Sequence, residues 1–441
     1  MKPETYFPFR NLLEYHNVTL PGFNISQAVR AAESGKNPGL GQYSFSWEEN
    51  GEILMLRDPL GSNKLFYGCN HDRNIVITNR IDTALSFGVS IDQLASCPPG
   101  HVIRWREGKI VSVKGFEISR VEIENNFNLK HFQKTVLDCI QKIFLRINEL
   151  WPKKKFVVCL SGGLDSSIIA YYASKYLHDV TATCFSHLSQ DDFSIWQKNS
   201  CIELSSISDD FRSAKNIAEA IGIPFRAVFR TKDMVFSSIE SAVKLGQDWR
   251  DFNVHCALVN LFLAQDIARD YKVQDVIVLT GDIMNELVCD YQEEVMSDGA
   301  TYYRQPRINT RKLRQFFCRG LDAGDREIGL FNGYGLSVVQ PYNFLADLYL
   351  RIPTSILEAP NSKHYLNDYL LPPHLIQHVG KTKTRAQVGG KDGGILGIFH
   401  KLGIKEARLK EIWRTNLPGL SKEKAYDIIQ FGRYRTTPWI G

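Results

Sequence analysis

Residues 161–167 have the composition and spacing of a phosphate-binding loop. They read Ser-Gly-Gly-Leu-Asp-Ser-Ser and directly follow an apolar stretch at 156–160. Glycines let the backbone approach an anion, and the start of a following helix offers N–H donors and a positive dipole end. Serine hydroxyls add further donors. The pattern indicates a cradle for phosphate groups, although a glycine turn with serine caps also suits plain helix initiation.

Asp165, inside this loop, favours phosphate binding over plain helix initiation. A carboxylate beside bound phosphates is unfavourable unless a divalent cation bridges them, so the loop predicts a site for a nucleotide with Mg²⁺. The loop differs from the Walker pattern G-x-x-x-x-G-K-[ST], because it lacks the lysine.

The elements that must position this loop form an alternating pattern. Short β-branched runs alternate with helical periodicity, which predicts a parallel sheet with covering helices and a ligand site at the carboxyl ends of its strands. The predicted strands are 156–160, 180–185 and 276–280, and the predicted helices include one from about residue 166 and one over 211–221.

The first part of the chain predicts a different architecture. Its short apolar or alternating runs are broken by Gly, Asn and Pro, which is typical of antiparallel strands. These runs are 42–47, 53–57, 65–67, 75–78, 101–105 and 110–113. Helical periodicity begins at Leu129, after a polar stretch at 119–128. We therefore expect an α/β protein of two domains, a β-rich α+β domain at 1–125 and a parallel-sheet domain at 126–441.

Composition excludes several classes of protein. The 441 residues carry 53 Lys and Arg against 48 Asp and Glu, and this net charge of +5 is too small to attract nucleic acid or membrane by itself. No apolar run reaches the roughly 18 residues of a membrane helix, and the first residues resemble no secretory signal. The nine cysteines never form a C-x-x-C pair. We expect a cytoplasmic protein with reduced cysteines, no membrane partner, and nucleic acid disfavoured as a partner.

The loop resembles the PP-loop of enzymes that split ATP into AMP and pyrophosphate, in particular the S-G-G-L-D-S-S of the asparagine synthetase family. Three further segments are similar to motifs of that family. They are 57–61 (Arg-Asp-Pro-Leu-Gly, followed by Lys64 and Phe66-Tyr67), 97–101 (Cys-Pro-Pro-Gly-His), and 279–287, which stands where the family has L-S-G-E-G-x-D-E-L.

The resemblance implies a fold and a set of ligand contacts. The fold would be an N-terminal domain like the glutaminase domain of Ntn hydrolases, followed by a PP-loop synthetase domain. Mg²⁺ would be held by Asp165 and Asn285. The residues implied to contact ATP are Leu160, Ser161, Gly162, Gly163, Asp165, Ser166, Ser167, Phe185, Thr280 and Gly281, with Phe185 a weaker candidate for the adenine wall.

Two further residues are implied to be catalytic. Lys383 stands six residues before Gly389, the spacing of the family's late active-site lysine, and would neutralise the departing pyrophosphate. Lys381 is the alternative, and both could instead be solvated surface charges. Asp282 occupies the position that helps to activate the nucleophile in the family, where it could accept a proton from an amine. Helix capping is its alternative role.

Departures from the family pattern shape the expected reaction. Glutamine-dependent members need a cysteine directly after the initiator Met, but position 2 is Lys, so we expect the N-terminal domain to be a degenerate glutaminase domain. Asn285 replaces a metal-binding Asp of the second motif, and Cys289-Asp290 replaces a Gly-Gly. An amide oxygen adds no charge, so metal binding should weaken or shift to Glu286 or Asp282.

These observations predict an ATP-dependent carbon-nitrogen ligase. It would adenylate a carboxylate, release AMP and pyrophosphate, and couple the acyl group to an amine or ammonia. Its substrates would be small molecules or peptides. The alternatives are an intramolecular cyclase like the β-lactam synthetases or lasso peptide cyclases, and a nucleotide-binding homologue without catalysis. Modification of tRNA is disfavoured, and a homodimer is left open.

Overall fold

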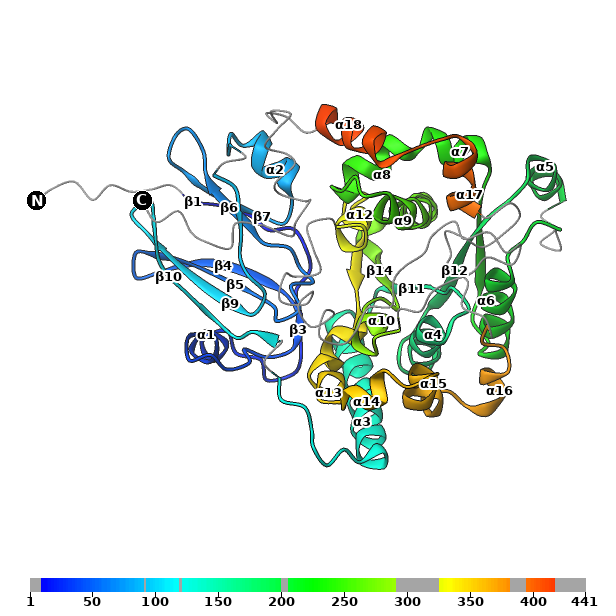
Figure 1. The fold of residues 1–441 in the computed structure, drawn as a ribbon, viewed down its shortest axis with the longest axis horizontal. Helices are drawn as coiled ribbons and strands as arrows, with labels where there is room; N and C mark the ends of the chain where they lie inside the picture. The colour runs from blue at the N-terminus through cyan, green and yellow to red at the C-terminus, as the bar shows by residue number, and fades with distance from the viewer. Residues whose placement is uncertain are drawn as a thin grey trace, which may run out of the picture.

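The computed structural model describes residues 9–90, 93–118, 121–199, 205–290, 325–380 and 394–416. Figure 1 shows a β-rich unit, coloured blue to light blue, beside a larger unit in which helices surround a sheet. The fold is mixed α/β, as the sequence predicts. The division at residue 125 stays a prediction, and the long helix α3 begins at Leu129.

Two four-stranded sheets build the N-terminal unit. One has the order β1 (Phe9–Leu12), β7 (Ile75–Thr78), β6 (Phe66–Cys69), β8 (Ala95–Ser96), and the other β10 (Lys109–Gly115), β9 (His101–Arg106), β5 (Glu52–Arg57), β4 (Ser44–Glu49). Their inner faces share one apolar cluster, which includes Met55 and Ile103 from one sheet and Tyr67 and Ile77 from the other. The predicted antiparallel pairing is found throughout except between β1 and β7, which are parallel. The short pair β2 (Val18–Thr19) and β3 (Gly41–Gln42) and the helices α1 (Ile25–Glu33) and α2 (Ile81–Ser86) complete the unit.

A five-stranded parallel sheet forms the centre of the larger unit. Its order is β13 (Phe225–Arg230), β12 (Val180–His187), β11 (Lys155–Cys159), β14 (Val276–Leu279), β15 (Ser337–Val339). All four strand pairs are parallel. The prediction of a parallel sheet is therefore confirmed, and β11, β12 and β14 fall within two residues of their predicted bounds.

Helices cover both faces of this sheet because its strands are apolar on both sides. Phe156 and Val158 of β11 point into one core, while Val157 points into the other. On the first face lie α3 (Leu129–Leu150), α4 (Leu164–Tyr176) and α6 (Asp209–Ala220), and on the second α8 (Ile239–Gly246), α9 (Asp251–Asp270) and α12 (Ile328–Asn332), as Figure 1 shows.

Shorter helices fill the remaining described ranges. They are α5 (Gln190–Asn199), α7 (Lys232–Ser237), α10 (Met284–Leu287), α13 (Ala346–Leu350), α14 (Thr354–Leu357), α15 (Ser362–Asn367), α16 (Pro373–Ile376), α17 (Gly394–Lys401) and α18 (Glu406–Asn416). Among the described helices, none combines the length and apolar character that crossing a membrane requires.

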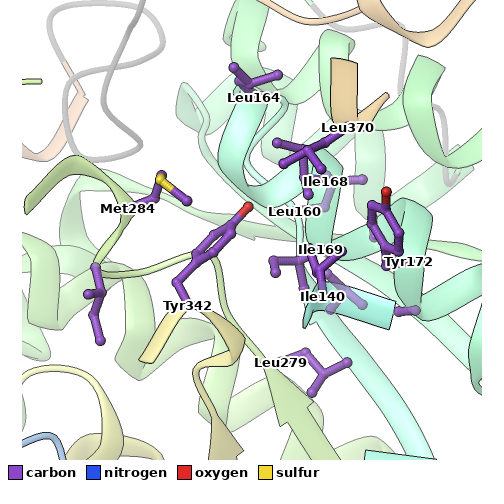
Figure 2. Close-up of a cluster of buried hydrophobic side chains, with 14 of the residues drawn as sticks. Ile140, Leu160, Leu164, Ile168, Ile169, Tyr172, Leu279, Met284, Tyr342 and Leu370 are labelled. Atoms are coloured by element: carbon purple, nitrogen blue, oxygen red, sulfur yellow. The ribbon is translucent and has the colours of Figure 1, made fainter. Parts of the chain in front are cut away.

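The core under α4 holds the predicted loop in place. Figure 2 shows Leu160, Ile168 and Tyr172 packed among buried side chains that come from α3 and the ends of β11 and β14. Tyr342 reaches from the segment after β15, and its hydroxyl donates to the main-chain oxygen of Asp165 over 2.8 Å. This hydrogen bond and the apolar packing hold the first turn of α4 in position.

Hydrogen bonds join the two units along β15 and α12. The Gln42 side chain donates to Val338 O (2.8 Å) and accepts from Gln340 N (3.0 Å). Its amide group thus pairs with the backbone of the β15 segment in the way that the backbone of a neighbouring strand would. The Tyr15 hydroxyl donates to Asp325 Oδ2 over 2.7 Å. Arg80 donates to the main-chain oxygen of Gly329 over 3.1 Å. The N-terminal unit is therefore bonded to elements next to the carboxyl ends of β14 and β15.

Candidate functional site

The loop 161–167 lies where the sequence predicts it, between the end of β11 and the start of α4. Gly162 has φ +79°, a conformation that side chains disfavour, and this turn reverses the chain into the helix. Gly163 is the N-cap residue of α4, and its first turn has no side-chain cap among the residues that the structure describes. The first-turn N–H groups and the positive dipole end therefore face the loop, as anion binding requires.

Serine hydroxyls bind one another and the backbone of the loop. Ser166 Oγ lies 3.0 Å from Ser161 Oγ and accepts from Ser161 N over 3.1 Å. Ser167 Oγ donates to the main-chain oxygen of Gly163 over 2.7 Å. These bonds fix the serine side chains relative to the loop backbone, so the groups predicted to contact phosphate are preorganised.

Gly162→Ala should destabilise this loop strongly. A Cβ there would lie 2.4 Å from the main-chain oxygen of Asp210 in addition to the strained φ, and together these effects should cost about 2 to 4 kcal/mol. Gly163→Ala is the matched control, because the one atom of the described residues that its Cβ would meet is Ser161 Oγ, at 3.6 Å. Urea unfolding of both variants measures the difference. Equal stabilities would show that the close approach of Gly162 to α6 does not matter.

The second predicted motif meets the first. A Cβ on Gly281 would lie 2.9 Å from Ser166 N, so the chain after β14 touches the first turn of α4 directly. Thr280 continues β14 through a bond from its N–H to Val339 O. The two segments are more than a hundred residues apart, and the structure brings them together at the carboxyl edge of the sheet, where parallel-sheet proteins bind ligands.

Asp165 and Asn285, the two predicted metal ligands, both contact the ammonium group of Lys363, which no sequence pattern marks as part of the site. The Lys363 ammonium lies 2.5 Å from Asp165 Oδ2 and 2.7 Å from Asn285 Oδ1. It also lies 3.2 Å from Asp290 Oδ2. Burial lowers the pKa of Lys363, but the carboxylates of Asp165 and Asp290 outweigh burial, and the net shift is upward. Lys363 is therefore charged at neutral pH.

These oxygens also suit Mg²⁺. Carboxylate and amide oxygens are its usual protein ligands, and Asp165 Oδ1 is buried with no hydrogen-bond partner in the described part of the chain. Within the same part, no group of three or more His, Cys, Asp or Glu side chains could hold a metal ion alone. A divalent cation there would thus complete its coordination with further oxygens, from water or from a ligand such as a phosphate.

Asp282 stands next to this loop in a charged surrounding. Burial and the negative charge of Glu327 raise its pKa to about 7, while the nearby Thr280 side chain and the charge of Arg326 act in the opposite direction. Glu327 is itself held by Gln340 Nε2, over 3.1 Å. A carboxyl group that titrates near neutrality can exchange protons with a substrate, as general acid-base catalysis requires.

Two predicted residues are buried in the core, and a third lies outside the described residues. Leu160 is 1% exposed, so only its main chain could contact a ligand. Phe185 is 4% exposed and stacks on Phe262 with ring centroids 5.7 Å apart. Its role in binding adenine stays a prediction. Lys383, with its alternative Lys381, lies outside the described residues, and so does the glycine-rich segment 389–393.

Lys363 and Glu327 are the residues that sequence reasoning missed as members of this site. Lys363 lies in the short helix α15 and meets a partner 198 positions earlier in the chain. Lysines are almost never buried unless paired, and no local pattern marks this one. Glu327 precedes α12 in a segment, 319–327, whose opposite charges predict salt-bridged structure bordering the substrate site but assign no role to this residue.

Comparisons with known proteins support the resemblance. The family model of asparagine synthase matches residues 152–326. A 75-residue stretch is 37% identical to the tRNA-specific 2-thiouridylase MnmA of Clostridium acetobutylicum, and it covers 17% of this chain and 20% of that protein. In the same enzyme of Clostridioides difficile, 35% of 88 residues are identical, over 19% and 23% of the two chains. The chain thus spans about a fifth of the length of these curated relatives.

Two solved structures are similar at low scores. NMN synthetase from Francisella tularensis has 16% identity and a TM-score of 0.25, over 71% of this chain and 95% of that one. The U34-tRNA thiolase NcsA from Methanococcus maripaludis has 14% identity and a TM-score of 0.31, over 71% and 81%. Scores this low say nothing of function. The residues that match the family model of asparagine synthase, 152–326, include the strand, loop and helix at 155–176.

Proposed function

We propose that the protein is an ATP-dependent amide-forming ligase that adenylates a carboxylate and releases AMP and pyrophosphate. One observation carries this proposal. The uncapped start of α4 follows β11 through a glycine turn, next to Gly281 and Lys363, inside an asparagine synthase domain. Such an arrangement suits a triphosphate whose β and γ groups leave together.

The residues of the loop would bind and orient the phosphates. The first-turn N–H groups of α4 and the hydroxyls of Ser161 and Ser166 would donate to phosphate oxygens. Asp165 and Asn285 would hold Mg²⁺, which supplies positive charge against the leaving pyrophosphate. We assign Lys383, or Lys381, to the same task. Thr280, Gly281 and the main chain of Leu160 would line the adenosine.

Asp282 would take a proton from the attacking amine. An amine must lose a proton to form an amide, and a carboxylate with a pKa of about 7 can accept it at neutral pH. Glu327 keeps that pKa high and would stabilise the positive charge of an approaching ammonium group. This pair favours an amine or ammonia as the acceptor.

We further propose that the amine arrives without a glutaminase step. In support, Arg57 of the motif at 57–61 donates to Gly61 O, Asn63 O and Cys97 O within its own unit, as a residue that stabilises a turn would. Asp58 accepts from the main chain of the same turn, at Leu60 and Ser62. Intramolecular ring closure is the alternative, and loss of one water from a single substrate would identify it.

The cysteines that the structure describes are free thiols, which fits our proposal of a cytoplasmic location.

Exchange of labelled pyrophosphate into ATP tests the proposal. We expect exchange that depends on a carboxylate substrate, with AMP rather than ADP as the nucleotide product of full turnover. A panel of amino acids, small carboxylic acids and short peptides would supply the carboxylate. Bulk tRNA belongs in the same assay, because the curated relatives act on tRNA according to their names. Formation of ADP, or exchange with tRNA alone, would refute the amide ligase.

A further inference from the structure

One buried ammonium occupies the point at which the predicted metal ligands converge. Lys363 Nζ contacts oxygens of Asp165, Asn285 and Asp290 over 2.5, 2.7 and 3.2 Å. The side chains of Lys363, Asp165 and Asp290 are 10%, 12% and 18% exposed. The group is therefore enclosed, and Asp165 Oδ1 remains buried beside it with no hydrogen-bond partner within the described ranges.

Asp290 gives this cluster its second negative charge. Cys289 has φ +56°, and this left-handed turn brings Asp290 back so that its N–H donates to Asn285 O over 2.9 Å. The side chain then faces the same ammonium as the Asn285 amide. Relative to the family motif, a carboxylate is missing at position 285 and a new one stands at position 290. Both changes fall on one cation-binding point.

We propose that Lys363 is an internal stand-in for a divalent cation, and that Asp290 with Asp165 supplies the carboxylates of that cation site. The inference rests on the proposed function for the identity of the nucleotide. Lys363 fills the site in the free protein, because a buried ammonium without a carboxylate partner is strongly unfavourable. A triphosphate bound at α4 would offer Lys363 new anionic partners, and Lys363 would then release the carboxylates to Mg²⁺.

This exchange has a measurable consequence without any nucleotide. While Lys363 holds the two carboxylates, a divalent cation must compete with it and should bind weakly. Removing the ammonium should leave two carboxylates and an amide oxygen around the position that Lys363 Nζ occupies, which is a ligand set for a hard cation. The nucleotide-free protein should therefore gain a binding site for a divalent cation when Lys363 is replaced by an uncharged residue.

Titration of the full chain with Mn²⁺ tests this, with free Mn²⁺ followed by electron paramagnetic resonance. We expect Lys363→Met to bind one Mn²⁺ per chain at least tenfold more tightly than the wild type. Adding Mn²⁺ should also raise the melting temperature of the variant more than that of the wild type. Adding Asp290→Asn to this variant should abolish the gain. Lys215→Met is the matched control, because Lys215 pairs with Glu219 on the surface of α6, and its loss should change nothing.

A second variant keeps the test decisive if Lys363→Met does not fold. Asn285→Asp adds a carboxylate while the lysine keeps its partners, and it should tighten Mn²⁺ binding severalfold over the wild type. Unchanged Mn²⁺ affinity in every folded variant, or equal affinity with and without Asp290, would overturn the inference. No nucleotide is present, so such a failure leaves the ligase proposal standing, whereas absence of pyrophosphate exchange would count against the ligase alone.

Discussion

Asp165→Asn should reduce pyrophosphate exchange at least about a hundredfold, because it removes the negative charge at the start of α4 that a divalent cation requires. The substitution keeps the shape of the side chain and the main-chain bond to Tyr342, so the loop geometry should persist. Initial exchange rates at saturating ATP and carboxylate measure the loss. A rate within threefold of the wild type would exclude a role for Asp165 in binding the cation.

The same change should also lower stability. Lys363 loses its nearest carboxylate, and breaking a buried ion pair by removing one partner costs about 3 to 5 kcal/mol, reduced here because Asp290 remains. Asp179→Asn is the matched control, since Asp179 pairs with Lys155 where both side chains are 49% exposed. Its loss should leave exchange and stability nearly unchanged. Chemical unfolding separates the two effects, because the loss of exchange must persist under conditions where the variant is folded.

Local patterns in the sequence predict the central elements of this fold well. β11 alternates between two cores, and the alternation of strands with helices specifies a parallel sheet before any contact is known. The phosphate loop is also local, since seven adjacent residues carry its glycine turn, hydroxyls and carboxylate. Predictions of this kind succeed because the determining residues are neighbours along the chain.

Other contacts between distant segments leave no signal in the local sequence. Lys363 belongs to a six-residue helix, too short for a periodic pattern, and its partners stand 73 to 198 positions away. The joint between the two units is equally hidden. Gln42 looks like an ordinary strand residue, yet its amide pairs with the backbone of Val338 and Gln340. Such pairings depend on the folded topology.

That joint gives the N-terminal unit a role apart from glutamine hydrolysis. Gln42 fixes the backbone of Gln340, and the Gln340 side chain donates to Glu327 Oε2. Glu327 in turn acts on Asp282 through its charge. Tyr15 holds Asp325, two residues before Glu327. The N-terminal unit therefore contacts the residues that influence the pKa of Asp282, a role it would keep in a chain of the kind we propose, without glutaminase activity.

Asp282→Asn should produce opposite effects on activity and stability. As the proposed base, Asp282 must be ionised, so amide formation in the wild type should rise with pH through about 7. The variant should lose about a hundredfold or more of the amide-forming rate, together with that pH dependence. Pyrophosphate exchange should change much less, because adenylation needs no proton transfer from the amine. Single-turnover rates from pH 5.5 to 9 would show both results.

Stability should change in the other direction because the pKa of Asp282 is raised from 3.8 to about 7 on folding. Between these values the folded protein holds a proton that the unfolded chain has lost, so this group makes the wild type less stable as pH rises from 4 to 7. Asn cannot ionise and escapes that penalty. Asp282→Asn should therefore be about 1 to 3 kcal/mol more stable than the wild type at pH 8, with the difference shrinking toward pH 4. Urea unfolding at both pH values measures this. A variant that is less stable than the wild type at pH 8 would show that Asp282 serves structure rather than proton transfer. If a charged residue is kept for catalysis at a cost to folding, removing its charge should stabilise the protein.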